Sequence, residues 1–278
     1  MPRPLGLRRR RRVARRAGAV AALAGTAALL ALAAPGAATS SERAPLRVGA
    51  AASLREVTEA SARSFEAAPS GGAVAVSYGA TSVLAAQLRA GAPLDVLLSA
   101  DAALSEALAR DGLTDPPVAF ARNRLVVIAR TGIARFAAAG DLADPALRRI
   151  AVPNAAVPVG RYAREWLAAR GLLDALRPRL VATEHARATL LAVEQGAADA
   201  ALVYATDAAH ARRAHVAWEI PASEQPEILY AASVSRAARD PERARAFVSL
   251  LSDGAGREHL ARAGFAPVAS SPAPAGTP

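Results

Sequence analysis

The chain has 278 residues, a formal net charge of +10 and no cysteine. The absence of cysteine excludes a disulfide framework and a lipid anchor on an N-terminal cysteine. Eight of the 34 basic residues lie within the first 16 positions, so residues 39–278 hold 26 basic and 24 acidic side chains, a net charge of +2. This near balance removes the main argument for nucleic-acid binding, and we expect no nucleic-acid partner.

Residues 1–38 are predicted to be a secretory signal peptide. An arginine-rich start without acidic residues precedes an apolar run at 17–34, and Gly36, Ala37 and Ala38 supply a cleavage site. An uncleaved membrane anchor is the alternative, because the run is borderline in length for a span. A mitochondrial transit peptide fits less well, since the apolar run is continuous rather than amphipathic. We expect a monomer, soluble in a bacterial periplasm, cleaved near Ala38 and exported by the general or the twin-arginine route.

The first half of the mature chain alternates short apolar stretches with amphipathic ones. This alternation predicts a parallel sheet with helices on both faces. The predicted strands are 46–51, 74–78 and 95–99, and the predicted helices are 54–68, 83–90 and 102–110.

The pattern restarts at Asn123. The predicted strands are 125–129, 150–152, 180–183, 200–204 and 228–233, and the predicted helices are 160–170, 185–195, 241–251 and 256–263. Residues 87–103 and 193–209 resemble each other, which favours two similar lobes. Within this repeat, Asp101 and Asp207 follow strands at matching positions and are predicted to cap helices.

We predict two lobes with a cleft between them. The first lobe comprises residues 44–121 plus 231–269, and the second comprises residues 122–230. Residues 270–278 are rich in serine, proline, alanine and glycine, so we expect a disordered tail.

Four junctions between a strand and a helix could face this cleft. They are Ser53, Thr81–Ser82, the turn at 157–160 and the turn at 184–186, and Tyr204 ends a further strand. Free amides at helix N-termini, together with hydroxyl groups, are well suited to holding an anion. A plainer interpretation of Ser53 is available, because Ser53-x-x-Glu56 is also a capping box that needs no ligand.

The chain resembles the periplasmic molybdate-binding proteins, the soluble receptors of molybdate ABC importers, over roughly residues 46–268. The stretches that carry the resemblance are AAASL (50–54), SYGATSVLAAQLRAGAPLDVLLSAD (77–101), NRLVVIAR (123–130), AVPNAAVPVGRYAREWL (151–167), ATEHARATLLAVEQGAADAALVYATDA (182–208) and AGFAP (263–267). The resemblance implies an α/β fold of the two-lobed type II periplasmic-binding-protein class, with mostly parallel sheets flanked by helices. It also implies lobes that close on the ligand, and delivery of the ligand to an inner-membrane ABC permease.

The resemblance places the oxyanion contacts on Ser53, Thr81, Val159, Ala186 and Tyr204. The side chains of Ser53, Thr81 and Tyr204 would donate hydroxyl protons, and the other two residues would donate backbone N–H groups. Serine is the usual residue where this chain has Thr81, so the added methyl group could alter the pocket size and the preference between molybdate and tungstate. Five neighbouring residues are candidates to support the site, and they are Ser82, Arg55, His185, Arg187 and Asp207.

Neutral donors alone suit a fully deprotonated dianion, because a protonated anion such as hydrogen phosphate also requires an acceptor. The resemblance implies that this dianion is molybdate or tungstate, and we expect no cofactor and no further metal site. Sulfate or another oxyanion is the nearest alternative, and a sensory receptor for a membrane kinase would share the same site. An enzyme, a hydrolase with Ser53 as nucleophile, is the alternative from a different class. It lacks a G-x-S-x-G elbow, and the four histidines show no recognised metal spacing.

Overall fold

The computed structural model describes residues 43–268, so the predicted signal peptide and the predicted tail lie outside the described residues. The described residues belong to a single compact unit. Among them, no helix has both the length and the apolar character needed to cross a membrane.

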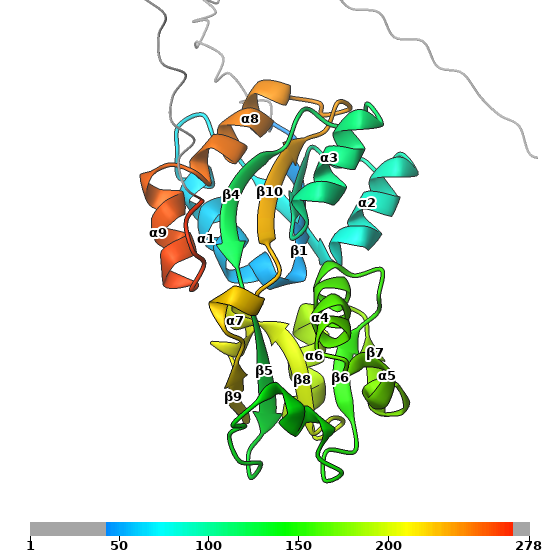
Figure 1. The fold of residues 1–278 in the computed structure, drawn as a ribbon. Coiled ribbons are helices and arrows are strands. Elements are labelled where there is room, and N and C mark those ends of the chain that lie inside the picture. The colour runs from blue at the N-terminus through cyan, green and yellow to red at the C-terminus, as the bar shows by residue number, and fades with distance from the viewer. Residues whose placement is uncertain (1–42, 269–278) are drawn as a thin grey trace, which may run out of the picture. The chain divides into compact units, whose positions relative to one another are not determined.

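The first sheet is built mainly from the N-terminal part of the chain (Figure 1). Its strands are β1 (Leu46–Ala51), β2 (Val74–Gly79), β3 (Val96–Ser99), β4 (Val118–Asn123) and β10 (Ile228–Val234), in the order β2-β1-β3-β10-β4. Strands β1, β2 and β3 pair in parallel, whereas β10 is antiparallel to both of its neighbours. One strand in this sheet therefore runs against the other four.

The second sheet repeats this arrangement. Its strands are β5 (Leu125–Arg130), β6 (Ile150–Pro153), β7 (Leu180–Thr183), β8 (Ala200–Tyr204) and β9 (Ala214–Glu219), in the order β7-β6-β8-β5-β9. Here β5 is the single strand that runs against the others. Strands β3 and β8, which lie within the two similar sequence stretches, hold the same third place in their sheets. The repeat noticed in the sequence therefore corresponds to equivalent structural positions.

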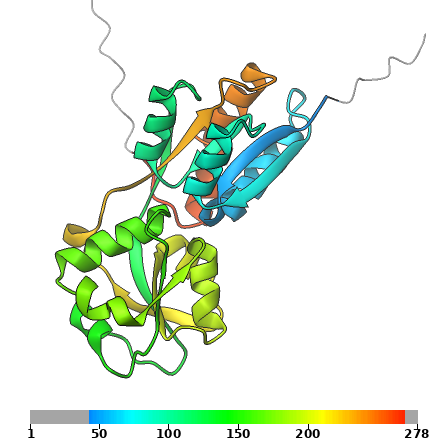
Figure 2. The same ribbon diagram turned by 90° about the vertical axis from the view of Figure 1, so that its right-hand side faces the viewer.

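Helices cover both faces of each sheet (Figures 1 and 2). The first lobe, defined here as the first sheet with its helices, contains α1 (Arg55–Glu66), α2 (Thr81–Arg89), α3 (Ala102–Arg110), α8 (Pro241–Leu250) and α9 (Gly254–Arg262). The second lobe contains α4 (Pro158–Ala169), α5 (Leu173–Leu176), α6 (Ala186–Glu194) and α7 (Ala205–Ala208). Short 3₁₀ helices lie at Ala52–Leu54 (η1), Ala139–Ala143 (η2), Arg177–Arg179 (η3) and Ala222–Glu224 (η4).

The chain crosses between the two sheets twice. It leaves the first sheet after β4 and enters β5 directly at Leu125, and it returns between β9 and β10. Strands β4 and β9 were not expected from the sequence, whereas the other strands and the longer helices lie within a few residues of their predicted positions.

Side chains cap some of the helices and leave others uncapped. Asp101, Asp240 and Asp253 cap α3, α8 and α9, each accepting a hydrogen bond from a backbone N–H of the first turn. No side chain caps α1, α2 or α4. The first amides of these three helices are therefore left without a side-chain acceptor.

Candidate anion-binding site

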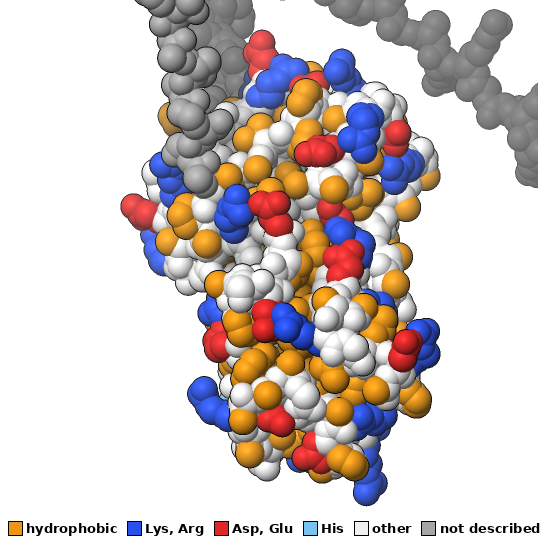
Figure 3. All heavy atoms as spheres, in the orientation of Figure 1, with side chains coloured by type: hydrophobic (Ala, Val, Ile, Leu, Met, Phe, Trp, Pro, Cys, Tyr) orange, Lys and Arg blue, Asp and Glu red, His pale blue; other side chains and the backbone are white. Residues whose placement is uncertain are grey.

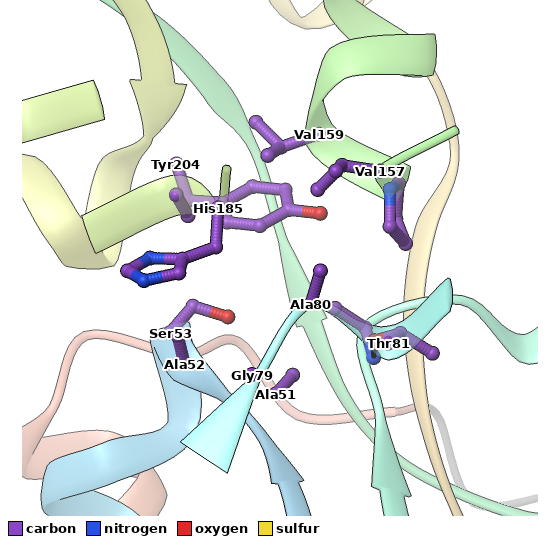
Figure 4. Close-up of a pocket in the computed structure, with 13 residues that line it drawn as sticks. Ala51, Ala52, Ser53, Gly79, Ala80, Thr81, Val157, Val159, His185 and Tyr204 are labelled. Atoms are coloured by element: carbon purple, nitrogen blue, oxygen red, sulfur yellow. Dashed lines mark hydrogen bonds between the residues drawn. The ribbon is translucent and has the colours of Figure 1, made fainter. Parts of the chain in front are cut away.

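A small cavity lies between the two lobes, at the carboxyl ends of strands from both sheets (Figure 4). Its empty volume is about 220 Å³. This figure includes the open space at the mouth of the cavity, so the enclosed part is smaller still. The residues lining it are Ala51, Ala52, Ser53, Gly79, Ala80, Thr81, Ala100, Val157, Pro158, Val159, His185, Ala186 and Tyr204.

Ser53 lines the cavity and does not cap a helix. The 3₁₀ turn η1 separates β1 from α1, so Leu54 rather than Ser53 takes the N-cap position, and no side chain accepts a hydrogen bond there. The Ser53 Oγ atom instead lies 2.9 Å from the Oη atom of Tyr230. The capping-box interpretation of Ser53 is therefore wrong, because the chain needs the extra turn between the strand and the helix.

Thr81 is the first residue of α2 and is 1% exposed. Its Oγ1 atom accepts a hydrogen bond of 3.0 Å from the backbone N–H of Ala100. This contact fixes the oxygen and leaves the hydroxyl proton free to be donated. The extra methyl group of threonine is accommodated in the buried wall of the cavity.

Val159 and Ala186 line the same cavity, near the starts of α4 and α6. Val159 follows Pro158, which has no N–H, so its amide is the first one available in α4. A Cβ atom at Gly160 would overlap the carbonyl oxygens of Pro153 and Asn154, so glycine is needed where the preceding loop meets the helix. Ala186 is the first residue of α6.

Tyr204 ends β8 and is 1% exposed. Its hydroxyl has no hydrogen-bond partner among the described residues. In Figure 4 the hydroxyl oxygens of Tyr204 and Ser53 both point into the space that the labelled residues enclose. Burial raises the pKa of Tyr204 well above its ordinary value, so the phenol stays protonated and available as a donor.

The predicted contact residues of the two lobes follow strands that hold equivalent places in the two sheets. Ser53 follows β1 and Val159 follows β6, which hold the second place in their sheets. Thr81 follows β2 and Ala186 follows β7, which hold the first place. The structure thus brings all five predicted contact residues to one cavity, and no acidic or basic side chain except the half-buried His185 is among its lining residues.

The five supporting candidates differ in position. His185 lines the cavity, and its Nδ1 atom accepts a hydrogen bond of 3.1 Å from the Ala188 N–H, so it caps α6. Desolvation lowers the pKa of His185, which favours the neutral ring that this bond requires. Ser82 and Arg55 do not line the cavity, and the Arg55 guanidinium stacks 4.0 Å from the centre of the Tyr78 ring.

Arg187 joins the two lobes. Its Nη2 atom lies 2.8 and 2.7 Å from the carboxylate oxygens of Glu56 in α1, and its Nε atom lies 3.2 Å from Asp207 Oδ1 in α7. Asp207 lies within α7 and does not cap it, so the predicted capping role is wrong for Asp207 and correct for Asp101. Burial raises the pKa of Asp207 to about 7, against the opposing effect of Arg187.

A second ion pair links the lobes through α3 and α4. The Nη2 atom of Arg161 lies 2.8 Å from Asp101 Oδ2. The cap of α3 thus also contacts the second lobe.

On the face shown in Figure 3, acidic and basic side chains are interspersed.

Two residues beside the cavity were missed by the sequence analysis. Tyr230 on β10 and Asn123 at the end of β4 are hydrogen bonded to each other, and Tyr230 also contacts Ser53. Tyr230 lies 177 positions from Ser53 along the chain, so no local pattern could reveal the contact. The NRLVVIAR stretch contained Asn123 but gave no reason to single it out.

Comparison with known proteins agrees with this architecture. Residues 46–266 match the family described as bacterial extracellular solute-binding protein. The chain belongs to this family.

Among described residues, no group of three or more histidine or acidic side chains could hold a metal ion, and the Ser53 hydroxyl contacts a tyrosine rather than a base.

Relatives of this solute-binding protein include proteins named for molybdate. It is 34% identical over 225 residues to the molybdate-binding protein ModA of Mycobacterium tuberculosis, covering 79% of this chain and 83% of that protein. It is 29% identical over 231 residues to ModA of Haemophilus influenzae, covering 80% and 90% of the two chains. Its fold matches the periplasmic molybdate-binding protein of Azotobacter vinelandii with a TM-score of 0.72 and 27% identity, covering 80% and 98%. The predicted two-lobed, type II periplasmic-binding-protein fold and the predicted resemblance are thereby confirmed.

Proposed function

We propose that this solute-binding protein binds molybdate, and also tungstate, in the periplasm and delivers it to an inner-membrane ABC importer. The observation that carries the proposal is the cavity itself. It is small, it lies between two lobes, and its hydroxyl and amide donors come from both of them. The names of its relatives point to the same ligand.

The donors suit a dianion that carries no proton. Three hydroxyl groups and the first amides of α4 and α6 can each donate a hydrogen bond to an anionic oxygen. Each charge-assisted bond contributes about 1.5–3 kcal/mol, and helix N-termini add favourable electrostatics without a cationic side chain. These bonds can outweigh the cost of bringing the lobes together around the ion.

The two crossings support a hinged closure. The chain passes between the lobes at Arg124 and again between β9 and β10, and Arg187 and Arg161 connect the lobes through α1 and α3. We propose that anion binding and these ion pairs together hold the lobes closed, and that opening releases the anion to the permease.

Thermal unfolding of the purified protein against an anion panel tests the proposal. A ligand at a hundred times its Kd stabilises a protein by about 2.7 kcal/mol, so saturating molybdate and tungstate should each raise the Tm clearly. Sulfate is smaller and should stabilise much less, phosphate should stabilise hardly at all, and citrate serves as the control. Equal stabilisation by sulfate and molybdate would instead assign the cavity to a general oxyanion receptor.

A further inference from the structure

A chain of three hydrogen-bonded side chains runs from the crossing between the lobes to the cavity. The Nδ2 atom of Asn123 lies 3.3 Å from the Oη atom of Tyr230, which lies 2.9 Å from the Oγ atom of Ser53. Tyr230 is fully buried and does not line the cavity, whereas Ser53 does. Tyr230 therefore reaches the cavity residues through its hydrogen bond to Ser53 and through edge-to-face packing on Tyr204, with ring centres 5.7 Å apart.

The direction of this chain follows from the backbone. The N–H of Arg124 donates to Asn123 Oδ1 at 2.9 Å, which identifies the oxygen end of the amide. The other end, Nδ2, must donate, and it does so to Tyr230 Oη and to Thr206 Oγ1, the latter at 2.9 Å. The Tyr230 oxygen thus already accepts a proton from Asn123.

Tyr230 has one proton of its own, and Ser53 is its remaining partner among the described residues. Were Ser53 the donor in this pair, the buried phenol proton would have no acceptor, which is costly in a protein interior. Tyr230 is therefore the donor and Ser53 the acceptor. Burial raises the pKa of Tyr230 above its ordinary value, so the proton stays on the phenol.

With one lone pair of Ser53 occupied by Tyr230, its own hydroxyl proton is directed to the cavity. We propose that Asn123 and Tyr230 are positioning residues that hold Ser53 as a donor and so make the site reject anions that carry a proton. The inference rests on the proposed function and adds a basis for its selectivity. A protonated anion could use Ser53 as an acceptor only if the serine proton turned away from the ligand into a wall that offers it no acceptor.

Sulfate and phosphate make a matched pair of probes. Both are small tetrahedral anions, but at neutral pH sulfate carries no proton and phosphate carries at least one. The readout is the ratio of the phosphate Kd to the sulfate Kd, obtained by competition against molybdate. A variant that loses folded protein, or binds all anions more weakly, changes both Kd values by the same factor and leaves their ratio unchanged. The ratio therefore does not change if Asn123 and Tyr230 have only a structural role.

Two variants change the chain in different ways. Tyr230→Phe removes the proton that occupies Ser53. Asn123→Asp replaces the amide donor with a carboxylate that accepts the Tyr230 proton. The direction of the hydrogen bonds is then reversed, and Ser53 becomes the donor to Tyr230. Tyr162→Phe, which removes another buried phenol hydroxyl from a residue outside the cavity lining, is the control.

We expect the wild-type protein to bind molybdate and to prefer sulfate strongly over phosphate. Asn123→Asp should narrow the phosphate-to-sulfate ratio by about tenfold, the equivalent of one hydrogen bond. Tyr230→Phe should narrow it less, because phenylalanine removes the opposing proton but offers the serine proton no acceptor, and the control should leave the ratio unchanged. An unchanged ratio in Tyr230→Phe and Asn123→Asp, or equal narrowing in Tyr162→Phe, would overturn the inference and leave the proposed function standing. A wild-type protein that binds no molybdate would overturn the proposed function itself.

Discussion

The Tyr204 hydroxyl should oppose folding and favour binding. In the structure this oxygen is buried at the cavity wall and has no hydrogen-bond partner among the described residues. Leaving a buried polar group unsatisfied costs about 1–3 kcal/mol, so Tyr204→Phe should stabilise the anion-free protein by up to that amount. For a chain of this size, each kcal/mol corresponds to about 2–4 °C in Tm.

The same substitution should weaken anion binding. The lost charge-assisted hydrogen bond is worth about 1.5–3 kcal/mol, or roughly a ten- to hundredfold increase in the molybdate Kd. Differential scanning calorimetry without anion and titration calorimetry with molybdate measure the two effects separately. Tyr162→Phe serves as the control for removing a phenol hydroxyl. A Tyr204→Phe variant with a lower anion-free Tm and an unchanged Kd would refute the reasoning and show that the hydroxyl is structural.

Two further predictions concern the charges near the cleft. The first is a double-mutant cycle of Glu56→Gln and Arg187→Gln. Because this ion pair joins the lobes, the coupling free energy between the two substitutions should be about 0.5–1 kcal/mol in molybdate binding, a two- to fivefold change in Kd. A coupling seen only in the stability of the anion-free protein would contradict a role in closure. The folded-state pKa of Asp207 is raised from 3.8 to about 7, so its stabilising contribution is complete below pH 3.8 and is lost as the pH rises to 7. Relative to Asp207→Asn, the wild-type unfolding free energy should therefore fall between these pH values by at most about 1.4 kcal/mol per pH unit, and parallel pH profiles in chemical denaturation would exclude this titration.

The strands read most plainly from the sequence are those buried on both faces. All five positions of Leu125–Ala129 in β5 are buried, and so is the whole of β3, which gives continuous apolar runs. The edge strands β2 and β7 were found because each leads into a helix, whereas β4 and β9, at the opposite edges, are not followed by an α-helix and fall outside the alternation of strand and helix. Their mixed composition, as in AFARN and HVAWE, looks like a loop when the partner strand is not known.

The cavity residues could be predicted because each one follows a strand, and this position is visible in the sequence. The support behind them could not, because it depends on contacts between distant parts of the chain. Glu56 looked like the second half of a capping box with Ser53, yet it pairs with Arg187 from the other lobe. Tyr230 looked like one more apolar residue of a buried strand, and its hydroxyl has a partner only once β1, β4 and β10 are assembled in the first sheet.

Two of the five donors at the cavity carry no chemical signature in their side chains. Val159 and Ala186 offer backbone amides, so almost any residue could replace them without removing a hydrogen-bond donor. The vulnerable positions beside Val159 are instead Pro158, which begins the helix, and Gly160, where a side chain would overlap two carbonyl oxygens. Under the proposed function, alanine substitution would therefore register Gly160, which does not line the cavity, and pass over Val159, whose amide is a proposed contact. Variation at Val159 and Ala186 among related sequences is accordingly no sign that the ligand has changed.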